Sequence, residues 1–217
     1  MIDLHTHTIL SDGELLASEL ARRAEVKGYT AIGITDHCDW SNIDFIVPHL
    51  VRAAESLNRH WKIKVIPGVE LTHIPLEEFD PLIKFAREHG AKVIIVHGET
   101  LSEPVIRGTN KKAIECGVDI LAHPGKISEE DASLAAEKDV MLEITARKSH
   151  SMTNRHVAEI ARKAGAKLVL NTDSHKAEDL LTKDMAAKIL NEAGLSKNEA
   201  EKVYENSEEF VASLLIS

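Results

Sequence analysis

Aromatic residues and positive charge are both scarce in this sequence, which limits the partners the protein can have. Only 4% of its 217 residues are aromatic, and aromatic side chains form the surfaces that stack nucleic-acid bases. The 35 acidic residues outnumber the 26 basic ones, so the formal net charge is −9. A negative net charge does not favour binding to a long phosphate backbone, which is itself negative. These counts argue against broad nucleic-acid binding, although a local basic patch would be compatible with them.

Cysteine and long apolar runs are scarce as well. The two cysteines, Cys38 and Cys116, are too few for a disulfide framework, and we expect a reducing, cytoplasmic compartment. No apolar run approaches the roughly 20 residues that span a bilayer, so we expect no membrane partner. We expect no secretory signal either, because Asp3, His5 and His7 stand where its apolar region would lie.

What the chain does contain is a repeated pattern: an amphipathic helix, a glycine near its end, a short β-branched run and then a polar residue. The first unit predicts a helix over residues 14–27, a strand over 31–35 and then Asp36 and His37. Further helices are predicted over 81–89, 109–116, 129–138 and 154–164, and further strands over 2–4, 65–69, 93–96, 120–122, 140–144 and 167–171. Alternation of this kind predicts a parallel sheet that is buried on both faces.

About seven such units suit a closed α/β barrel of the TIM type, and a doubly wound open sheet is the alternative. Residues 180–215 are predicted to form two or three closing helices. The length of 217 residues fits one domain, 1–217, in which residues 1–176 carry all the motifs and 177–217 close the structure. A monomer is the default expectation.

Nearly every predicted strand ends in a polar residue, and in a barrel of parallel strands that rim is where active sites are built. His5 and His7 are two residues apart, so an extended chain points both inward and Leu4 outward to the helices. Asp173 and His175 repeat this spacing on the last strand. The set expected to converge comprises six histidines, two aspartates and one glutamate: His5, His7, Asp12, His37, Glu70, His97, His123, Asp173 and His175.

Histidine nitrogen and carboxylate oxygen suit Zn, Mn or Fe. Nine ligands are too many for one tetrahedral ion, so about two to three divalent ions fit better, with a shared carboxylate between two of them. One histidine at a strand end could be a packing residue, but the coincidence of so many strand ends favours a metal centre. Asp36 is expected to orient the ring of His37, and Asp3 to play a similar supporting role. His73 could also line the site.

These residues resemble the PHP family, named for polymerases and histidinol phosphatase. The resemblance runs from residue 1 to about 176. It rests on Asp3-Leu4-His5-Thr6-His7, Ser11-Asp12-Gly13, Ile34-Thr35-Asp36-His37, Gly68-Val69-Glu70, Val96-His97, Ala122-His123-Pro124-Gly125 and Thr172-Asp173-Ser174-His175. It implies a distorted (β/α)7 barrel with a trinuclear metal centre at the carboxyl rim of the strands.

Carried over by position, the resemblance assigns three groups of ligands. One metal would take His5, His7, Glu70 and Asp173; a second would take the bridging Glu70 with His97 and His123; the third would take Asp12, His37 and His175. The segment 40–62 is too short for the inserted domain of the family's nucleotide- and RNA-processing phosphoesterases, and no polymerase domain is visible. The chain therefore resembles the stand-alone, histidinol-phosphatase-like type.

Paired divalent ions lower the pKa of a bridging water towards ~7, and in-line attack on phosphorus suits them. The expected reaction is hydrolysis of a small phosphomonoester by a metal-bridging hydroxide positioned by Glu70. Asp173 and His175 are candidates to protonate the leaving group, although both are also assigned as ligands. Arg147 is the main candidate for a bidentate phosphate contact. Weaker candidates are Lys148, His150 and Arg107. Glu99 could support the site or bind a substrate amine, but we favour its interpretation as an exposed loop carboxylate.

Other functions stay open. The family includes nucleotide and short-oligonucleotide phosphoesterases, protein-tyrosine phosphatases, and non-catalytic subunits of ribonucleoprotein or polymerase assemblies. Those non-catalytic relatives have degenerate metal positions, whereas this chain has all nine. Metal-dependent amidohydrolases share His-x-His on a barrel, but they commonly have a bridging lysine where this chain has Glu70.

Overall fold

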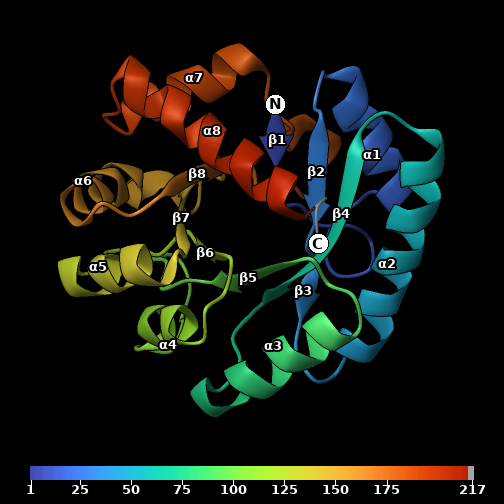
Figure 1. The fold of residues 1–217 in the computed structure, drawn as a ribbon, viewed down its shortest axis with the longest axis horizontal. Coiled ribbons are helices and arrows are strands. Elements are labelled where there is room, and N and C mark those ends of the chain that lie inside the picture. The colour runs from blue at the N-terminus through green and yellow to red at the C-terminus, as the bar shows by residue number, and fades with distance from the viewer. Residues whose placement is uncertain (215–217) are drawn as a thin grey trace.

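A nearly closed barrel of parallel strands forms the centre of the protein, as the repeated pattern predicts (Figure 1). The structure is a computed structural model, and it describes residues 1–214. Its strands are β1 (Ile2–Asp3), β2 (Ala31–Ile34), β3 (His37–Cys38), β4 (Lys64–Leu71), β5 (Val93–His97), β6 (Ile120–Ala122), β7 (Met141–Thr145) and β8 (Leu168–Asn171). Neighbours follow the order β1-β2-β4-β5-β6-β7-β8. Because β2 and β3 both pair with β4, these two short strands occupy one position in the barrel. The eight strands therefore fill seven positions, and the predicted (β/α)7 barrel is confirmed.

The barrel closes between its first and last strands through few contacts. An isolated parallel bridge joins Thr6 to Ser174, and the His7 N–H donates to the Ser174 carbonyl at 2.8 Å. The side chain of Asn171 accepts a hydrogen bond from the Leu4 N–H at 2.9 Å. These bonds replace the regular ladder of hydrogen bonds that joins the other strand pairs. They hold β1 and β8 side by side, and we call this junction the barrel seam.

Helices surround the strands and follow them in the chain. They are α1 (Ala17–Val26), α2 (Ile43–His60), α3 (Phe79–Glu88), α4 (Thr109–Glu115), α5 (Glu129–Lys138), α6 (Asn154–Ala164), α7 (Lys183–Glu192) and α8 (Lys197–Leu214). The predicted bounds of α5 and α6 are confirmed. In both helices, the hydrophobic spacing and a suitable end residue agree: Ser128 caps α5, and Gly165 ends α6 in the left-handed conformation. No helix within residues 1–214 has the length and apolar character to cross a membrane.

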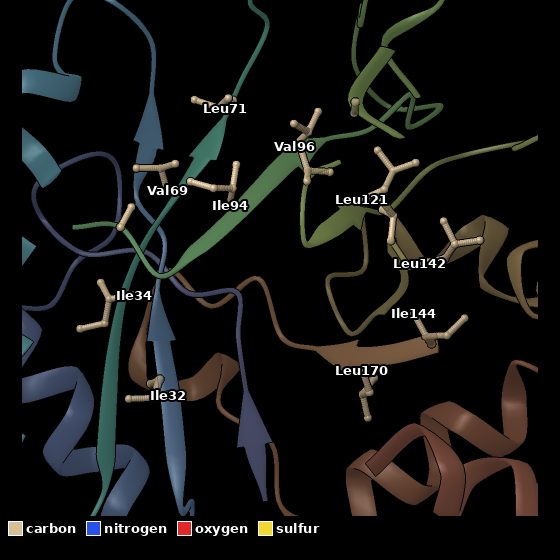
Figure 2. Packing of buried hydrophobic residues seen from close by; sticks show 14 of the residues in the cluster. Ile32, Ile34, Val69, Leu71, Ile94, Val96, Leu121, Leu142, Ile144 and Leu170 are labelled. Atoms are coloured by element: carbon tan, nitrogen blue, oxygen red, sulfur yellow. The ribbon is translucent and has the colours of Figure 1, made fainter. Parts of the chain in front are cut away.

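The apolar core has two layers, because alternate residues of each strand face opposite ways. The outer layer packs the strands against the helices, and Figure 2 shows its members Ile34, Val69 and Ile94. The inner layer fills the barrel with side chains such as Ile66 and Ile95. The inward row on β4 continues from Ile66 to Glu70, and the row on β5 continues from Ile95 to His97, so the polar rim lies directly on an apolar floor.

Helix α8 covers the other end of the barrel (Figure 1). Its Phe210 and Val211 pack on the inner layer, and the side-chain amide of Asn206 donates to the Leu168 carbonyl at 2.8 Å. This end is therefore sealed by apolar contacts, which leaves the carboxyl rim of the strands as the polar end of the barrel.

Leu4 does not point outward as predicted. It packs in the inner layer with Ile66 and Ile95, while the neighbouring His5 still reaches the rim. Regular pairing of β1 ends at Asp3, so the alternation on which the prediction relied breaks at residues 4 and 5. Close approach of the chain here requires Gly33, since a Cβ at that position would lie 2.6 Å from the Leu4 carbonyl oxygen.

Candidate metal centre

The structure brings all nine residues of the predicted set together at the rim. Their nitrogen and oxygen atoms form overlapping groups in which all ligand atoms lie within 4.8 Å of one another. The groups are His7 with Asp12, His37 and His175; His5 with His123 and Asp173; His5 with His7 and Glu70; and Glu70 with His97 and His123. Each residue belongs to at least one group that resembles a ligand set for a metal ion.

Glu70 lies at the centre of the arrangement. Its Oε1 is 3.2 Å from His97 Nδ1 and 3.3 Å from His5 Nε2, and its Oε2 is 2.7 Å from His37 Nδ1. The carboxylate is fully buried. Burial alone would raise the pKa of Glu70, but the imidazoles of His5 and His37 outweigh it and hold that pKa well below its usual range. Glu70 therefore stays a carboxylate in the barrel interior.

Several buried atoms of the centre have no hydrogen-bond partner among the described residues. They include Nε2 of His5 and both ring nitrogens of His7 and of His123. Leaving a buried polar atom unpaired costs about 1–3 kcal/mol, and such atoms rarely gather in one place without a ligand. Imidazole nitrogens and carboxylate oxygens turned towards one another suit bound divalent cations, so the residues present fit a metal centre.

Two ligand positions have unusual backbone conformations. Asp173 has a φ of 52° and His123 a φ of 27°, both on the positive side where residues other than glycine are rarely found. Strain of this kind concentrates at functional sites. Here it turns two side chains, one after β6 and one after β8, towards His5.

Glu143 supports His5, and sequence reasoning missed it. Its Oε2 lies 2.8 Å from His5 Nδ1 and also accepts a hydrogen bond from the Asn171 amide at 3.2 Å. A carboxylate on one ring nitrogen fixes the tautomer and leaves the other nitrogen free for a metal. The sequence does contain a sign of this role, because Glu143 stands in the middle of the apolar strand β7. A charge buried there needs a partner.

An outer cluster of Asp12, His37 and His175 lies closer to solvent. His175 Nε2 is 3.0 Å from Asp12 Oδ2, and His37 Nε2 is 3.6 Å from Asp12 Oδ1. The Asp12 side chain is 53% exposed. Its partial burial would raise its pKa, but the hydrogen bond from His175 and the nearby imidazole of His37 hold that pKa well below the usual range. A carboxylate between two imidazoles is thus also available here.

Asp36 supports a different residue from the one predicted. Its carboxylate accepts hydrogen bonds from the Thr8 N–H and hydroxyl, both at 2.8 Å, and from the Ser11 hydroxyl at 2.6 Å. These bonds fix the loop that carries Asp12. The ring of His37 instead contacts the Thr72 hydroxyl at 2.7 Å, so the expectation that Asp36 orients His37 was wrong.

Asp3 holds the barrel seam. It accepts a hydrogen bond from the Thr172 hydroxyl at 2.5 Å and another from the His5 N–H at 3.3 Å. Burial raises the pKa of Asp3 to about 6, although these hydrogen bonds act against the shift. The contacts place Asp3 between β1 and β8, directly behind two ligand positions.

Among the predicted substrate contacts, Arg147 and His150 reach the centre. Arg147 Nη1 lies 2.8 Å from His175 Nδ1 and donates to the Asp173 carbonyl at 3.1 Å. His150 stacks on His123 with ring centroids 4.3 Å apart. Burial, together with the charge of neighbouring His123, lowers the pKa of His150 to about 4.

The other predicted substrate contacts lie farther out. Lys148 is exposed and lines a cavity that also includes Asp173 and His175. Arg107 is exposed, and within residues 1–214 no hydrogen bond or ion pair connects it to the centre. Glu99 is a structural residue rather than an amine site, because its carboxylate accepts the N–H groups of Gly108 and Asn110 at 2.9 and 3.0 Å.

Glu103 was not expected at the centre. It lies in the loop after β5, and its Oε2 is 3.1 Å from Nε2 of both His97 and His73. Its Oε1 is 3.5 Å from His150 Nε2. No strand ends at Glu103, so only the path of the loop could have revealed this contact.

His73 lies at the edge of the site, as the sequence suggested.

Comparisons with known proteins agree with this geometry. The PHP domain family matches residues 3–182. An uncharacterized protein of Methanocaldococcus jannaschii is 48% identical over 92% of each chain. A probable phosphatase of Shewanella loihica is 29% identical over 88% of this chain and 85% of its own length. Ribonuclease P protein component 3 of Methanosarcina barkeri is 28% identical over 91% of this chain and 82% of its own length.

Two solved structures share the fold at low sequence identity. A chain of an archaeal ribonuclease P with mature tRNA has a TM-score of 0.76 at 18% identity, covering 99% of this chain and 91% of that one. Histidinol phosphate phosphatase of Lactococcus lactis, solved with zinc, L-histidinol and phosphate, has a TM-score of 0.63 at 18% identity, covering 90% and 94%. The match over residues 3–182 and the shared barrel show that this chain belongs to the PHP domain family.

Proposed function

We propose that the protein is a metal-dependent phosphoesterase that hydrolyses a small phosphomonoester, of which histidinol phosphate is the named example among its structural relatives. The observation that carries the proposal is the buried carboxylate of Glu70 among five imidazoles, with unpaired nitrogens turned towards it. Relatives named as probable phosphatases support the same class of reaction.

Two to three divalent ions, Zn, Mn or Fe, would be held by the nine residues. His5, His7, Glu70 and Asp173 form the first set, Glu70, His97 and His123 the second, and Asp12, His37 and His175 the third; the groupings of atoms at the rim support this division. Bound ions would lower the pKa of water and neutralise charge on the phosphoryl oxygens. Glu70 is the carboxylate that the first and second sets share.

The chain's own residues would bind and orient the substrate. Arg147 contacts the protein through Nη1 and Nε, so its Nη2 is the donor left for a phosphoryl oxygen. Glu143 holds His5 in one tautomer. Asp173 and His175 border the same cavity as Arg147, so both stay candidates to donate a proton to the leaving alkoxide.

Free Cys38 and Cys116 accord with a reducing, cytoplasmic setting.

A second candidate is a subunit of an RNA-processing assembly. Its support is the archaeal ribonuclease P chain, with a TM-score of 0.76, and the identity of 28% to ribonuclease P protein component 3. The nine filled ligand positions and the net charge of −9 favour the phosphoesterase. An assembly subunit would have no need to retain a complete hydrolytic centre.

The test is phosphate release by protein loaded with Zn, Mn or Fe. Histidinol phosphate and a panel of other phosphomonoesters serve as substrates, and Glu70→Gln is the matched inactive variant. We expect release from at least one ester by the wild type and none by the variant. Wild-type protein with full metal content and no release from any ester would instead favour the assembly subunit.

A further inference from the structure

A trough leads away from the outer cluster, between the loop after β7 and helix α7. It consists of two adjoining cavities of about 680 and 600 Å³. The larger cavity includes Asp12, Asp173 and His175 in its lining, so it opens directly onto the candidate metal centre. The two cavities share four lining residues, which are Ala146, Lys148, Leu181 and Met185.

The size of the trough exceeds what a short phosphomonoester needs. Pockets of roughly 300–1,000 Å³ hold molecules of drug size, and each of these cavities falls in that range by itself. A phosphoryl group with a short alcohol would be accommodated in the cavity next to His175. The second cavity, beside α7, leaves room for the rest of a longer substrate.

The far cavity carries positive charge in a chain whose net charge is −9. Its lining includes Lys148, Arg155 and Lys188 against one acidic residue, Glu192. Glu192 only partly compensates these cations: its carboxylate is 3.8 Å from Lys188 Nζ, and only its backbone carbonyl, at 3.2 Å, accepts from Arg155. The Lys148 ammonium group forms no hydrogen bond or ion pair with any residue of the described range 1–214, although the backbone carbonyl of Lys148 accepts one from the Ser151 hydroxyl. The surplus of cations is complementary to an anionic group.

The trough also has an apolar wall, and part of this wall is exposed. Met152 is 70% exposed and Met185 is 47% exposed, and beneath them the buried Leu181 and half-buried Ile189 also line the trough. Unbranched methionine side chains adapt their shape to different apolar partners. An exposed apolar wall bordered by cations is typical of a ligand site.

We infer that the substrate is an elongated phosphomonoester whose alcohol part has an apolar body and a second anionic group at its far end. The inference rests on the proposed phosphoesterase function. The phosphoryl group lies at the outer cluster, the body lies against Met152 and Met185, and the distal anion faces Arg155 and Lys188, which line only the cavity beside α7. Lys148 lines both cavities and therefore contacts the substrate between its two ends.

The test compares three esters on metal-loaded protein: ethyl phosphate, hexyl phosphate and hexyl phosphate with a terminal carboxylate. We expect kcat/KM to rise about tenfold from ethyl to hexyl, because part of the added chain leaves water. The carboxylate should add a further factor of about three to ten, as expected for a partly exposed ion pair.

Variants separate the two contributions. Lys188→Glu should cancel the gain from the carboxylate, and Met185→Asp should reduce the gain from chain length. Lys84→Glu, an exposed lysine on α3 outside the trough, is the matched control and should change neither ratio.

Three results would overturn the inference. Equal kcat/KM for all three esters would remove it and leave the phosphoesterase function standing. No turnover of any ester at full metal occupancy would remove both. Inhibition of ethyl phosphate hydrolysis by a short single-stranded RNA, relieved by Lys188→Glu, with no gain from the carboxylate, would assign the trough to nucleic acid instead.

Discussion

The inner and outer parts of the candidate metal centre are built in different ways. Glu70 and His97 stand on the regular strands β4 and β5, directly above the apolar floor, and are buried. Asp12 and His175 stand on loops, and Asp12 is half exposed. Buried charged groups need compensation in order to be tolerated at all, whereas exposed ones do not. The inner part should therefore govern metal content, and the outer part should adjust reactivity.

The largest effect is expected for Glu70→Ala. The change removes the carboxylate shared by two ligand sets, so hydrolysis should fall by a factor of about 10³ or more and bound metal should drop. Elemental analysis of purified protein, alongside phosphate release, measures both. Glu88→Ala, an exposed glutamate on α3, is the control. Wild-type activity and metal content in the Glu70 variant would refute the central position of Glu70.

A smaller effect is expected for Asp12→Asn, which changes only the outer part. One ligand of the outer cluster loses its charge, so kcat should fall about 100-fold while the ions of the inner part stay bound. Steady-state kinetics and metal analysis of the same sample test this. Asp44→Asn, an exposed position on α2, is the control. Loss of all metal from the Asp12 variant would show that the two parts do not behave separately.

Glu143→Gln tests the support of the inner part. Glutamine keeps the size of the side chain but removes the charge that holds His5 Nδ1. Metal affinity should fall about 10- to 100-fold, as for other carboxylates that orient a ligating histidine. Titration with a competing chelator measures it. An unchanged affinity would mean that the apolar floor alone positions His5.

The smallest effect concerns stability. Asp12 is half exposed, so Asp12→Asn should change the free energy of unfolding of metal-free protein by about 0.5 kcal/mol or less, which shifts Tm by roughly 1–2 °C. Removing metal from the wild type should lower Tm by about 5–10 °C, since a ligand at 100 times its Kd contributes about 2.7 kcal/mol. Thermal unfolding with and without chelator compares the two. Equal shifts would contradict the division into parts.

The sequence predicted the strands and the side chains that gather at the rim because those depend on local patterns. Alternating helices and apolar runs place the strands, and Glu70 and His97 follow from where the runs end. Leu4 was predicted wrongly because strand pairing breaks where the barrel closes, which depends on contacts with β8. Glu103 reaches His97 through the course of a loop.

Supporting residues were harder to predict than ligands. Asp36 precedes His37 in the chain, and that adjacency suggested a contact between them. Its carboxylate instead accepts hydrogen bonds from Thr8 and Ser11, residues brought near by the pairing of β1 with β2. Contacts of this kind depend on the register of neighbouring strands, which no local pattern in the sequence specifies.

The most direct test of the account measures bound metal and phosphate release on one sample. We predict about two to three divalent ions per chain and a kcat/KM of about 10⁴ M⁻¹s⁻¹ or more for at least one phosphomonoester. Loss of both in Glu70→Ala would tie the activity to the buried carboxylate. A chain with its full complement of ions that releases no phosphate from any phosphomonoester would contradict the proposed function.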